Sequence, residues 1–306
     1  MTARRVRGIR ALRVVGSVVV LFVALAIATA NGVVGRVSVT GSPAAEPVPS
    51  GVATSSPSSP REQGLPIAAV TAADRTQLGV AVLDRFTGEL AVGARGSETF
   101  LTASLSKIVI AVDIIDRRRH DGLAVSENDL ELLRRALGPS DDGAMNVLWT
   151  RFDGPGAAAR VSQRAGLTNT RAPRDHSQWG EMSTTAADLT QLWRYVLDDM
   201  PPEDAEFIID AIAAAPPIAR DGFDQRFGLL ASEITGPGGP GAIAKQGWMC
   251  CFSGQYYLHS VGAVGPNHRF LVTVLARLPR SGWAAARTEL TTIARAAVRD
   301  LGLAAH

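Results

Sequence analysis

Ser104 and Lys107 form the first pair of residues in the sequence whose types and spacing could support chemistry. They lie three positions apart at the start of a helix predicted over 104–117, so their side chains project from one face of it. A serine at a helix N-terminus lies in a positive backbone potential that favours a developing oxyanion. Burial in an apolar helix lowers the pKa of lysine and favours the neutral amine that accepts a proton from serine. The alternative is that Ser104 only caps the helix and Lys107 extends into solvent.

Lysine is rare in this chain, which makes each lysine informative. Lys107 and Lys245 are the only two, against 29 arginines. Arginine stays protonated at any working pH, whereas a buried lysine can lose its proton. The two lysines are therefore candidates for a role that arginine cannot fill, although codon bias with two chance survivors is the simpler explanation.

Two further short motifs follow in the chain. Ser140-Asp141-Asp142 precedes a predicted helix, and Lys245-Gln246-Gly247 lies in a predicted strand near the C-terminus. A serine and a carboxylate could pass a proton to a leaving group and hold a substrate, but Ser and Asp are also preferred helix caps. The lysine could supply positive charge in a cleft, and the glycine would let a substrate backbone approach closely. An edge lysine in solvent is the alternative.

The order of these motifs, S-x-x-K, S-x-x and K-x-G, resembles the signature of class A β-lactamases and penicillin-binding proteins. The similarity extends over about residues 76–302. It includes three longer segments, FLTAS at 100–104, SDDGAMNVLW at 140–149 and STTAADL at 183–189. Each motif is weak alone, but all three in order, with both lysines inside them, make a specific signal.

The resemblance implies a role for each matched residue. Ser104 would be the acylated nucleophile, Lys107 its base, Ser140 the proton shuttle and Lys245 its electrostatic support. The backbone N–H groups of Ser104 and Trp248 would form the oxyanion hole, each contributing about 3 kcal/mol to the transition state. The substrate-binding residues would be Asp142, Gln246, Gly247, Trp248 and His259. His259, a lone strand histidine, could instead be structural, and Trp248 could be core.

Three departures from the family pattern bear on activity. Asp142 stands where the family usually has Asn, and its carboxylate would repel a substrate carboxylate. Gln246 stands where a hydroxyl residue is usual. The loop over 171–183 lacks the E-x-x-x-N element that positions the deacylating water, and its titratable residues are Asp175, His176 and Glu181. The stretch from Ser104 to Ser140 is also short for the family. We therefore expect acylation to be faster than deacylation.

The N-terminus predicts export. Five arginines in residues 1–13 precede an uncharged apolar run of 17 residues, Val14–Ala30. Residues 1–35 are predicted to be either a cleaved signal peptide or an uncleaved anchor, which places the rest of the chain outside the cytoplasm. Both cysteines lie far downstream, so none near this run can carry a lipid. Residues 36–75 are rich in Ser, Pro and Ala and predict a disordered spacer.

Composition excludes several classes of function. Six arginines and no acidic residue lie in residues 1–36, and without those arginines the chain has 25 basic against 29 acidic residues. The body therefore offers no basic face for nucleic acid. Neither a metal site nor a cofactor is predicted, because the five histidines are scattered and the cysteines, Cys250 and Cys251, are adjacent. These two could be free thiols, a vicinal disulfide or small buried residues.

The element pattern predicts one α/β (α+β) domain over 76–306. Strands are expected over 77–84, 89–94, 242–249, 255–264 and 270–278, with a closing helix over 283–301. Helices between them suggest a five-stranded antiparallel sheet covered by helices, with an all-helical lobe inserted over about 118–235. The predicted protein is a monomeric, exported serine hydrolase acting on a β-lactam or a D-alanyl cell-wall peptide. A catalytically silent wall-associated scaffold of the same fold and a membrane-tethered interaction module are the alternatives.

Overall fold

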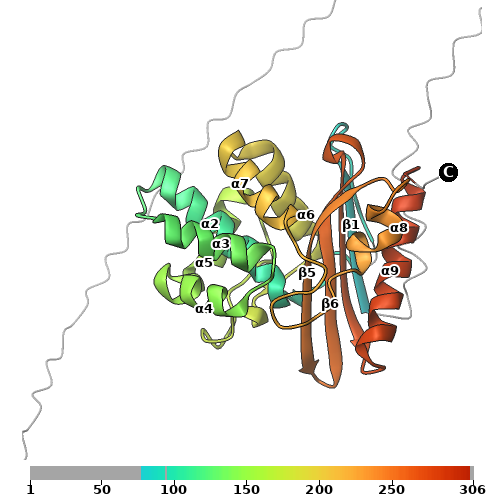
Figure 1. Ribbon diagram of the computed structural model, residues 1–306. Helices are drawn as coiled ribbons and strands as arrows, with labels where there is room; N and C mark the ends of the chain where they lie inside the picture. The colour runs from blue at the N-terminus through green and yellow to red at the C-terminus, as the bar shows by residue number, and fades with distance from the viewer. Residues whose placement is uncertain (1–76, 94, 304–306) are drawn as a thin grey trace, which may run out of the picture. The chain divides into compact units, whose positions relative to one another are not determined.

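The computed structural model describes residues 77–93 and 95–303 (Figure 1). The predicted signal or anchor segment, residues 1–35, and the predicted spacer, residues 36–75, lie outside the described residues. Among the described helices, none is both long and apolar enough to span a membrane.

A five-stranded antiparallel sheet joins the two ends of the described chain, which confirms the predicted fold class. The strand order is β2-β1-β7-β6-β5. The strands are β1 (Gln77–Asp84), β2 (Leu90–Val92), β5 (Ala242–Phe252), β6 (Gln255–Val264) and β7 (Phe270–Pro279). β1 pairs with β7 along its whole length, from Gln77 opposite Arg277 to Asp84 opposite Phe270. β5, which carries the third motif, is therefore an edge strand.

Helices cover both faces of the sheet (Figure 1). Strand side chains alternate between faces, and on β1 Val80 and Val82 pack with the C-terminal helix while Ala81 and Leu83 face the helical lobe. The C-terminal helix α9 (Trp283–Asp300) packs on β6 and β7. The other helices are α2 (Ser106–His120), α3 (Glu127–Leu137), α4 (Asp142–Arg151), α5 (Gly154–Ala165), α6 (Ala186–Arg194), α7 (Pro202–Ala213) and α8 (Ser232–Thr235).

Short elements complete the fold. The 3-10 helices are η1 (Ala103–Leu105), η2 (Trp179–Glu181), η4 (Gly228–Leu230) and η5 (Pro266–His268), with a π-helix η3 (Tyr195–Asp199) and a two-stranded sheet of β3 (Phe100–Leu101) and β4 (Ser183–Thr184).

α2 is the buried central helix, as its apolar sequence predicts. The apolar side chains from Ile108 to Ile115 are at most 1% exposed. Asp113, also buried in α2, accepts hydrogen bonds of 2.7 and 2.8 Å from the guanidinium of Arg160 on α5. Such a charge-assisted bidentate contact satisfies the buried carboxylate and fixes α2 against α5. The residues at the start of α2 therefore stand on a rigid support.

Some predicted boundaries were wrong. Ser104 lies in the 3-10 turn η1, and α2 begins at Ser106. β2 covers only Leu90–Val92 of the predicted 89–94, and β5 runs on to Phe252. α5 was not predicted, because it begins with Gly154-Pro155-Gly156, residues that are typical of a turn.

Candidate active site

A cavity of about 380 Å³ lies over Ser104, between the helical lobe and the edge strand β5. Its lining residues are Ala103, Ser104, Asp142, Asn146, Ser177, Gln178, Trp179, Gly180, Trp248 and Met249. Asp142 is the only titratable side chain in that set. Within residues 77–93 and 95–303, no group of three or more His, Cys, Asp or Glu residues could hold a metal ion.

Two residues of this site adopt a backbone conformation that non-glycine residues rarely use. Ala103, directly before the candidate nucleophile, has φ +47°, and Ser140 has φ +57°. Such conformations cost roughly 1–3 kcal/mol each and persist only where the surrounding structure fixes them. Both side chains, Ser104 and Ser140, lie within hydrogen-bond distance of Lys107.

The four residues expected to be catalytic form one connected hydrogen-bond network. Lys107 Nζ lies 3.0 Å from Ser104 Oγ and 3.1 Å from Ser140 Oγ, and it donates to the Ser140 carbonyl at 2.8 Å. Lys245 Nζ donates to the same Ser140 Oγ at 2.9 Å. Ser140 therefore bridges the two lysines, and a proton path leads from Ser104 through Lys107 to Ser140.

Burial lowers the pKa of both lysines. Lys107 and Lys245 are each 1% exposed. Desolvation lowers the pKa of the Lys107 amine, although the Asp142 carboxylate opposes this. Desolvation, followed by repulsion from Lys107, holds the pKa of Lys245 well below its usual range. Two ammonium groups sharing one serine disfavour each other, which favours the neutral form of one of them.

The second motif divides its roles among three residues. Asp141, not Ser140, caps α4: its side chain accepts from the Ala144 N–H and pairs with Arg135. Asp142 pairs with Lys107 at 2.6 Å from Oδ1 to Nζ, and its side chain is 57% exposed. The helix-cap explanation of this motif therefore applies to Asp141, while Ser140 and Asp142 face the lysines.

Two residues of the third motif do not present side chains to a substrate. Gln246 is fully buried, and its amide donates to the backbone carbonyls of Gln225 and Phe227. A Cβ added at Gly247 would lie 3.1 Å from Leu105 Cγ and 3.1 Å from the Thr102 carbonyl. Gly247 is thus required for close packing of β5 against the Ser104 turn. The prediction that the Gln246 side chain binds the substrate is wrong, because that side chain is buried and bonded to the backbone.

His259 is also not placed to bind a substrate anion. It is 0% exposed, its Nε2 lies 2.8 Å from the Leu101 carbonyl, and its Nδ1 accepts from the Ala276 N–H. This pattern requires the neutral tautomer with the proton on Nε2. Desolvation lowers the pKa of His259 to about 4. The structural alternative for this histidine therefore agrees with its contacts, since it ties β6 to β3 and β7.

The buried neutral His259 predicts a loss of stability in acid. The unfolded chain takes up a proton near pH 6.5, whereas the folded chain resists protonation down to about pH 4. The free energy of unfolding should therefore fall by about 3 kcal/mol from this residue as pH drops through that window. Urea unfolding at pH 7 and pH 4.5 measures it. In His259→Gln the difference between the two pH values should shrink, and an unchanged difference would contradict the assignment.

Trp248 forms a wall of the cavity. Its indole stacks on Phe223, with ring centroids 4.6 Å apart and planes 7° apart, and its Nε1–H donates to Asp221 at 2.9 Å. Ser104 and Trp248 line the same cavity. The oxyanion hole from their backbone N–H groups stays a prediction.

The sequence did not identify two residues of the opposite wall. The Trp179 ring lies with its centroid 4.9 Å from Lys107 Nζ, and its Nε1–H donates to Asn146 at 2.8 Å. Trp179 belongs to the loop over 171–183, where only charged candidates were considered. Asp175, His176 and Glu181 do not line the cavity. Near Ser104, this loop therefore presents the indole of Trp179 to the cavity and no carboxylate.

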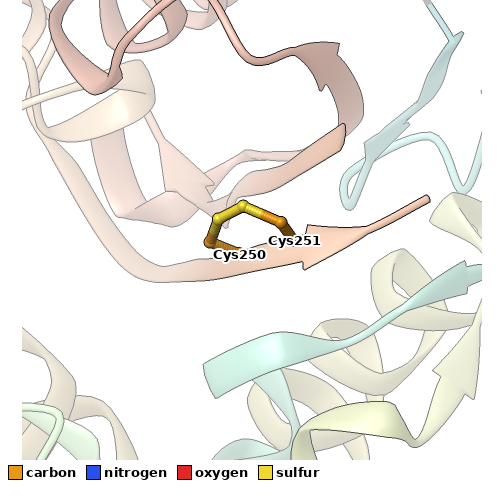
Figure 2. Close-up of a disulfide and its surroundings, with 2 residues drawn as sticks. All are labelled: Cys250 and Cys251. Carbon is orange, nitrogen blue, oxygen red and sulfur yellow. A yellow bond between two sulfur atoms is a disulfide. The ribbon is translucent and has the colours of Figure 1, made fainter. Parts of the chain in front are cut away.

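Cys250 and Cys251 form a disulfide between neighbouring residues near the end of β5 (Figure 2). The vicinal disulfide was one of three possibilities that the sequence left open. It follows Met249, which lines the cavity, and coincides with a shift in the pairing register between β5 and β6.

Comparisons with known proteins agree with this architecture. No family profile matches the sequence. The chain is 34% identical over 221 residues to the protein named "Putative lipoprotein LppW" in Mycobacterium tuberculosis and Mycobacterium bovis, covering 71% of this chain and 68% of the relative. The class A β-lactamase of Mycobacterium abscessus has a TM-score of 0.59 at 17% identity, covering 78% of this chain and 99% of that enzyme. TLA-3 extended-spectrum β-lactamase has a TM-score of 0.64 at 13% identity, covering 78% and 98%. The chain thus belongs to the LppW family and has the class A β-lactamase fold.

Proposed function

We propose that this protein is a serine acyl-transfer enzyme that forms an ester at Ser104 with a β-lactam or a D-alanyl cell-wall peptide. One observation supports this above all: Ser104, Lys107, Ser140 and Lys245 are joined in a single hydrogen-bond network beside an open cavity. The β-lactamase-type fold agrees with it but does not by itself establish activity.

In the proposed reaction, neutral Lys107 accepts the proton of Ser104 as its Oγ attacks the carbonyl carbon. The tetrahedral oxyanion is held by backbone N–H groups of Ser104 and Trp248. When the C–N bond breaks, Ser140 gives its proton to the leaving nitrogen and regains one from Lys107. Lys245 steadies the charge on Ser140 throughout. The step leaves an acyl ester on Ser104 and a protonated leaving nitrogen.

Intact-mass measurement after incubation with benzylpenicillin and, separately, with a fluorophosphonate tests the proposal. We expect a covalent adduct on wild-type protein and none on Ser104→Ala. Peptide mapping should place the adduct on Ser104. Wild-type protein left unmodified by both probes, or an adduct that survives in Ser104→Ala, would contradict the proposed reaction.

A catalytically silent scaffold of the same fold is the second candidate. The observation in its favour is the ion pair between Lys107 and Asp142, because a carboxylate beside the amine stabilises its protonated, non-basic form. The same mass measurement separates the two candidates, since a scaffold would bind ligands without forming an ester.

The proposed enzyme works in the cell envelope, outside the cytoplasm. The arginine-led apolar run at 14–30 and the lipoprotein name of its relatives support this location. Residues 1–60 fused to an alkaline phosphatase that folds only after export should give an active enzyme outside the cytoplasmic membrane. The matched fusion lacking residues 14–30 should be inactive. Equal activity of the two fusions would contradict the assignment.

A further inference from the structure

Carboxylates flank the candidate active site on both sides. Asp142, from the helical lobe, lines the cavity and is more than half exposed. Asp221, from the loop between α7 and η4, does not itself line the cavity but accepts a hydrogen bond from the indole of Trp248, which forms the opposite wall. Asp142 pairs with Lys107 at 2.6 Å, and the charges of both carboxylates raise the pKa of Lys107 and of Lys245 against the effect of burial.

No cationic side chain lines the cavity. The two lysines beneath it are buried, and their ammonium groups are hydrogen-bonded to protein acceptors, Lys107 to four atoms and Lys245 to two. Arg287, which packs over Phe223, lies on α9 and interacts with Asp224. The side-chain amide of Gln246 donates to the backbone carbonyls of Gln225 and Phe227, so it is not available to bind a substrate. A substrate carboxylate in the cavity would therefore meet the Asp142 carboxylate on its lining and the Asp221 carboxylate behind Trp248, with no cationic side chain among the lining residues.

From this arrangement we infer that the cleft selects acyl donors in which the group beside the reacting carbonyl is neutral or cationic rather than a carboxylate. The inference rests on the proposed acyl transfer at Ser104 and specifies its substrate class. Like charges brought together in a partly desolvated site are strongly disfavoured, whereas a cation there would gain attraction from both aspartates.

A charge series that shares one reacting ring isolates this effect. The probes are benzylpenicillin, which carries a carboxylate, its neutral methyl ester and its 2-(diethylamino)ethyl ester, which carries a protonated amine. In each, Ser104 Oγ bonds to the lactam carbonyl carbon, the C–N bond breaks and the nitrogen receives a proton. Acylation rates are measured by intact mass on the full chain and divided by each compound's rate of hydrolysis by hydroxide. This removes differences in intrinsic reactivity.

We expect the normalised rate to rise from acid to methyl ester to amino ester, by about tenfold for each step. Asp221→Asn keeps an acceptor for Trp248 but removes the charge, and should reduce the acid-to-ester ratio about threefold or more. Asp224→Asn is the matched control, because it removes the same charge from the same loop while its carboxylate pairs with Arg226. That variant should retain the wild-type ratio.

The outcomes separate this inference from the proposed function. Acylation of wild-type protein by the acid as fast as by the esters would overturn the inference and leave the proposed function intact. An ester preference that Asp221→Asn and Asp142→Asn leave unchanged would also overturn it, because the aspartates would not be its cause. If none of the three compounds acylates Ser104, the proposed function fails and the inference fails with it.

Discussion

Replacement of Lys107 by arginine is expected to slow acylation of Ser104 by on the order of 10²–10⁴-fold, the usual contribution of a general base. Arginine keeps the positive charge but cannot release its proton at working pH. Lys107 Nζ lies 3.0 Å from Ser104 Oγ, and burial lowers its pKa. Stopped-flow or quenched intact-mass kinetics with the methyl ester of benzylpenicillin would give the rate.

Lys245→Arg is the matched control, since it makes the same exchange at the chain's other lysine. Lys245 is proposed to act through its charge, so arginine should preserve more activity there than at position 107. Circular dichroism and thermal melting of both variants show whether each still folds around its larger buried side chain. A normal rate in folded Lys107→Arg would show that Lys107 is not the base.

The pH profile tests the same assignment without a substitution. Acylation should increase as the pH rises through the pKa of Lys107, because only the neutral amine accepts a proton. Since that pKa is lowered by burial, the increase should lie below the range of an ordinary lysine. Asp142→Asn removes a carboxylate that raises the pKa of Lys107 and should move the increase to still lower pH. Labelling with ¹⁵N-lysine should give just two Nζ signals to compare with the profile, because the chain has two lysines.

The sequence predicted the centre of this site better than its walls. Ser104, Lys107, Ser140 and Lys245 were identifiable because their residue types carry chemistry and because lysine is otherwise missing from the chain. The structure joins all four in one hydrogen-bond network, in which Lys107 contacts both serines and Lys245 contacts Ser140. The five-stranded sheet was also predictable, since its strands alternate or run apolar between clear turn residues.

In the third motif, similarity to the family pattern predicted the wrong role for the Gln246 side chain. A strand sends successive side chains to opposite faces, so Lys245 and Gln246 cannot both point into one cleft without an irregularity. That rule alone would have turned Gln246 away from the cleft, as its buried amide contacts show. His259 pairs with Gly247 in the β5–β6 ladder and faces the Ser104 turn. Its role was left open between substrate binding and structure, because a histidine's tautomer and burial are not visible in sequence.

Trp179 and Asp221 could not be found from the sequence for another reason. Trp179 begins the short 3-10 helix η2 and Asp221 lies in a loop, and neither segment is long enough for a periodic pattern to fix the direction of a side chain. Trp179 lines the cavity, where Asn146 on α4 accepts its indole N–H, and Asp221 is held next to the cavity wall by the indole N–H of Trp248. Long-range contacts of this kind depend on the finished fold.

Hydrolysis of the ester at Ser104 is expected to be much slower than its formation. Deacylation of a β-lactam ester needs an activated water, and a missing general base typically costs 10²–10⁴-fold in rate. In the loop over 171–183, Trp179 lines the cavity, and no carboxylate of that loop does. The Asp175 carboxylate is held by the N–H and hydroxyl of Ser177, contacts that lower its pKa and make it a poorer base.

A time course with a chromogenic cephalosporin, used as its neutral ester, measures this balance directly. The expected trace is a burst of about one equivalent followed by slow turnover, with the trapped adduct visible by intact mass. Trp179→Ala, which opens the wall to water, should shorten the adduct's lifetime, whereas Trp193→Phe, at a buried tryptophan away from the cavity, should not. Rapid steady turnover without a burst would contradict the prediction. Loss of that turnover in Asp142→Asn would then identify Asp142, the carboxylate that lines the cavity, as the group that activates water.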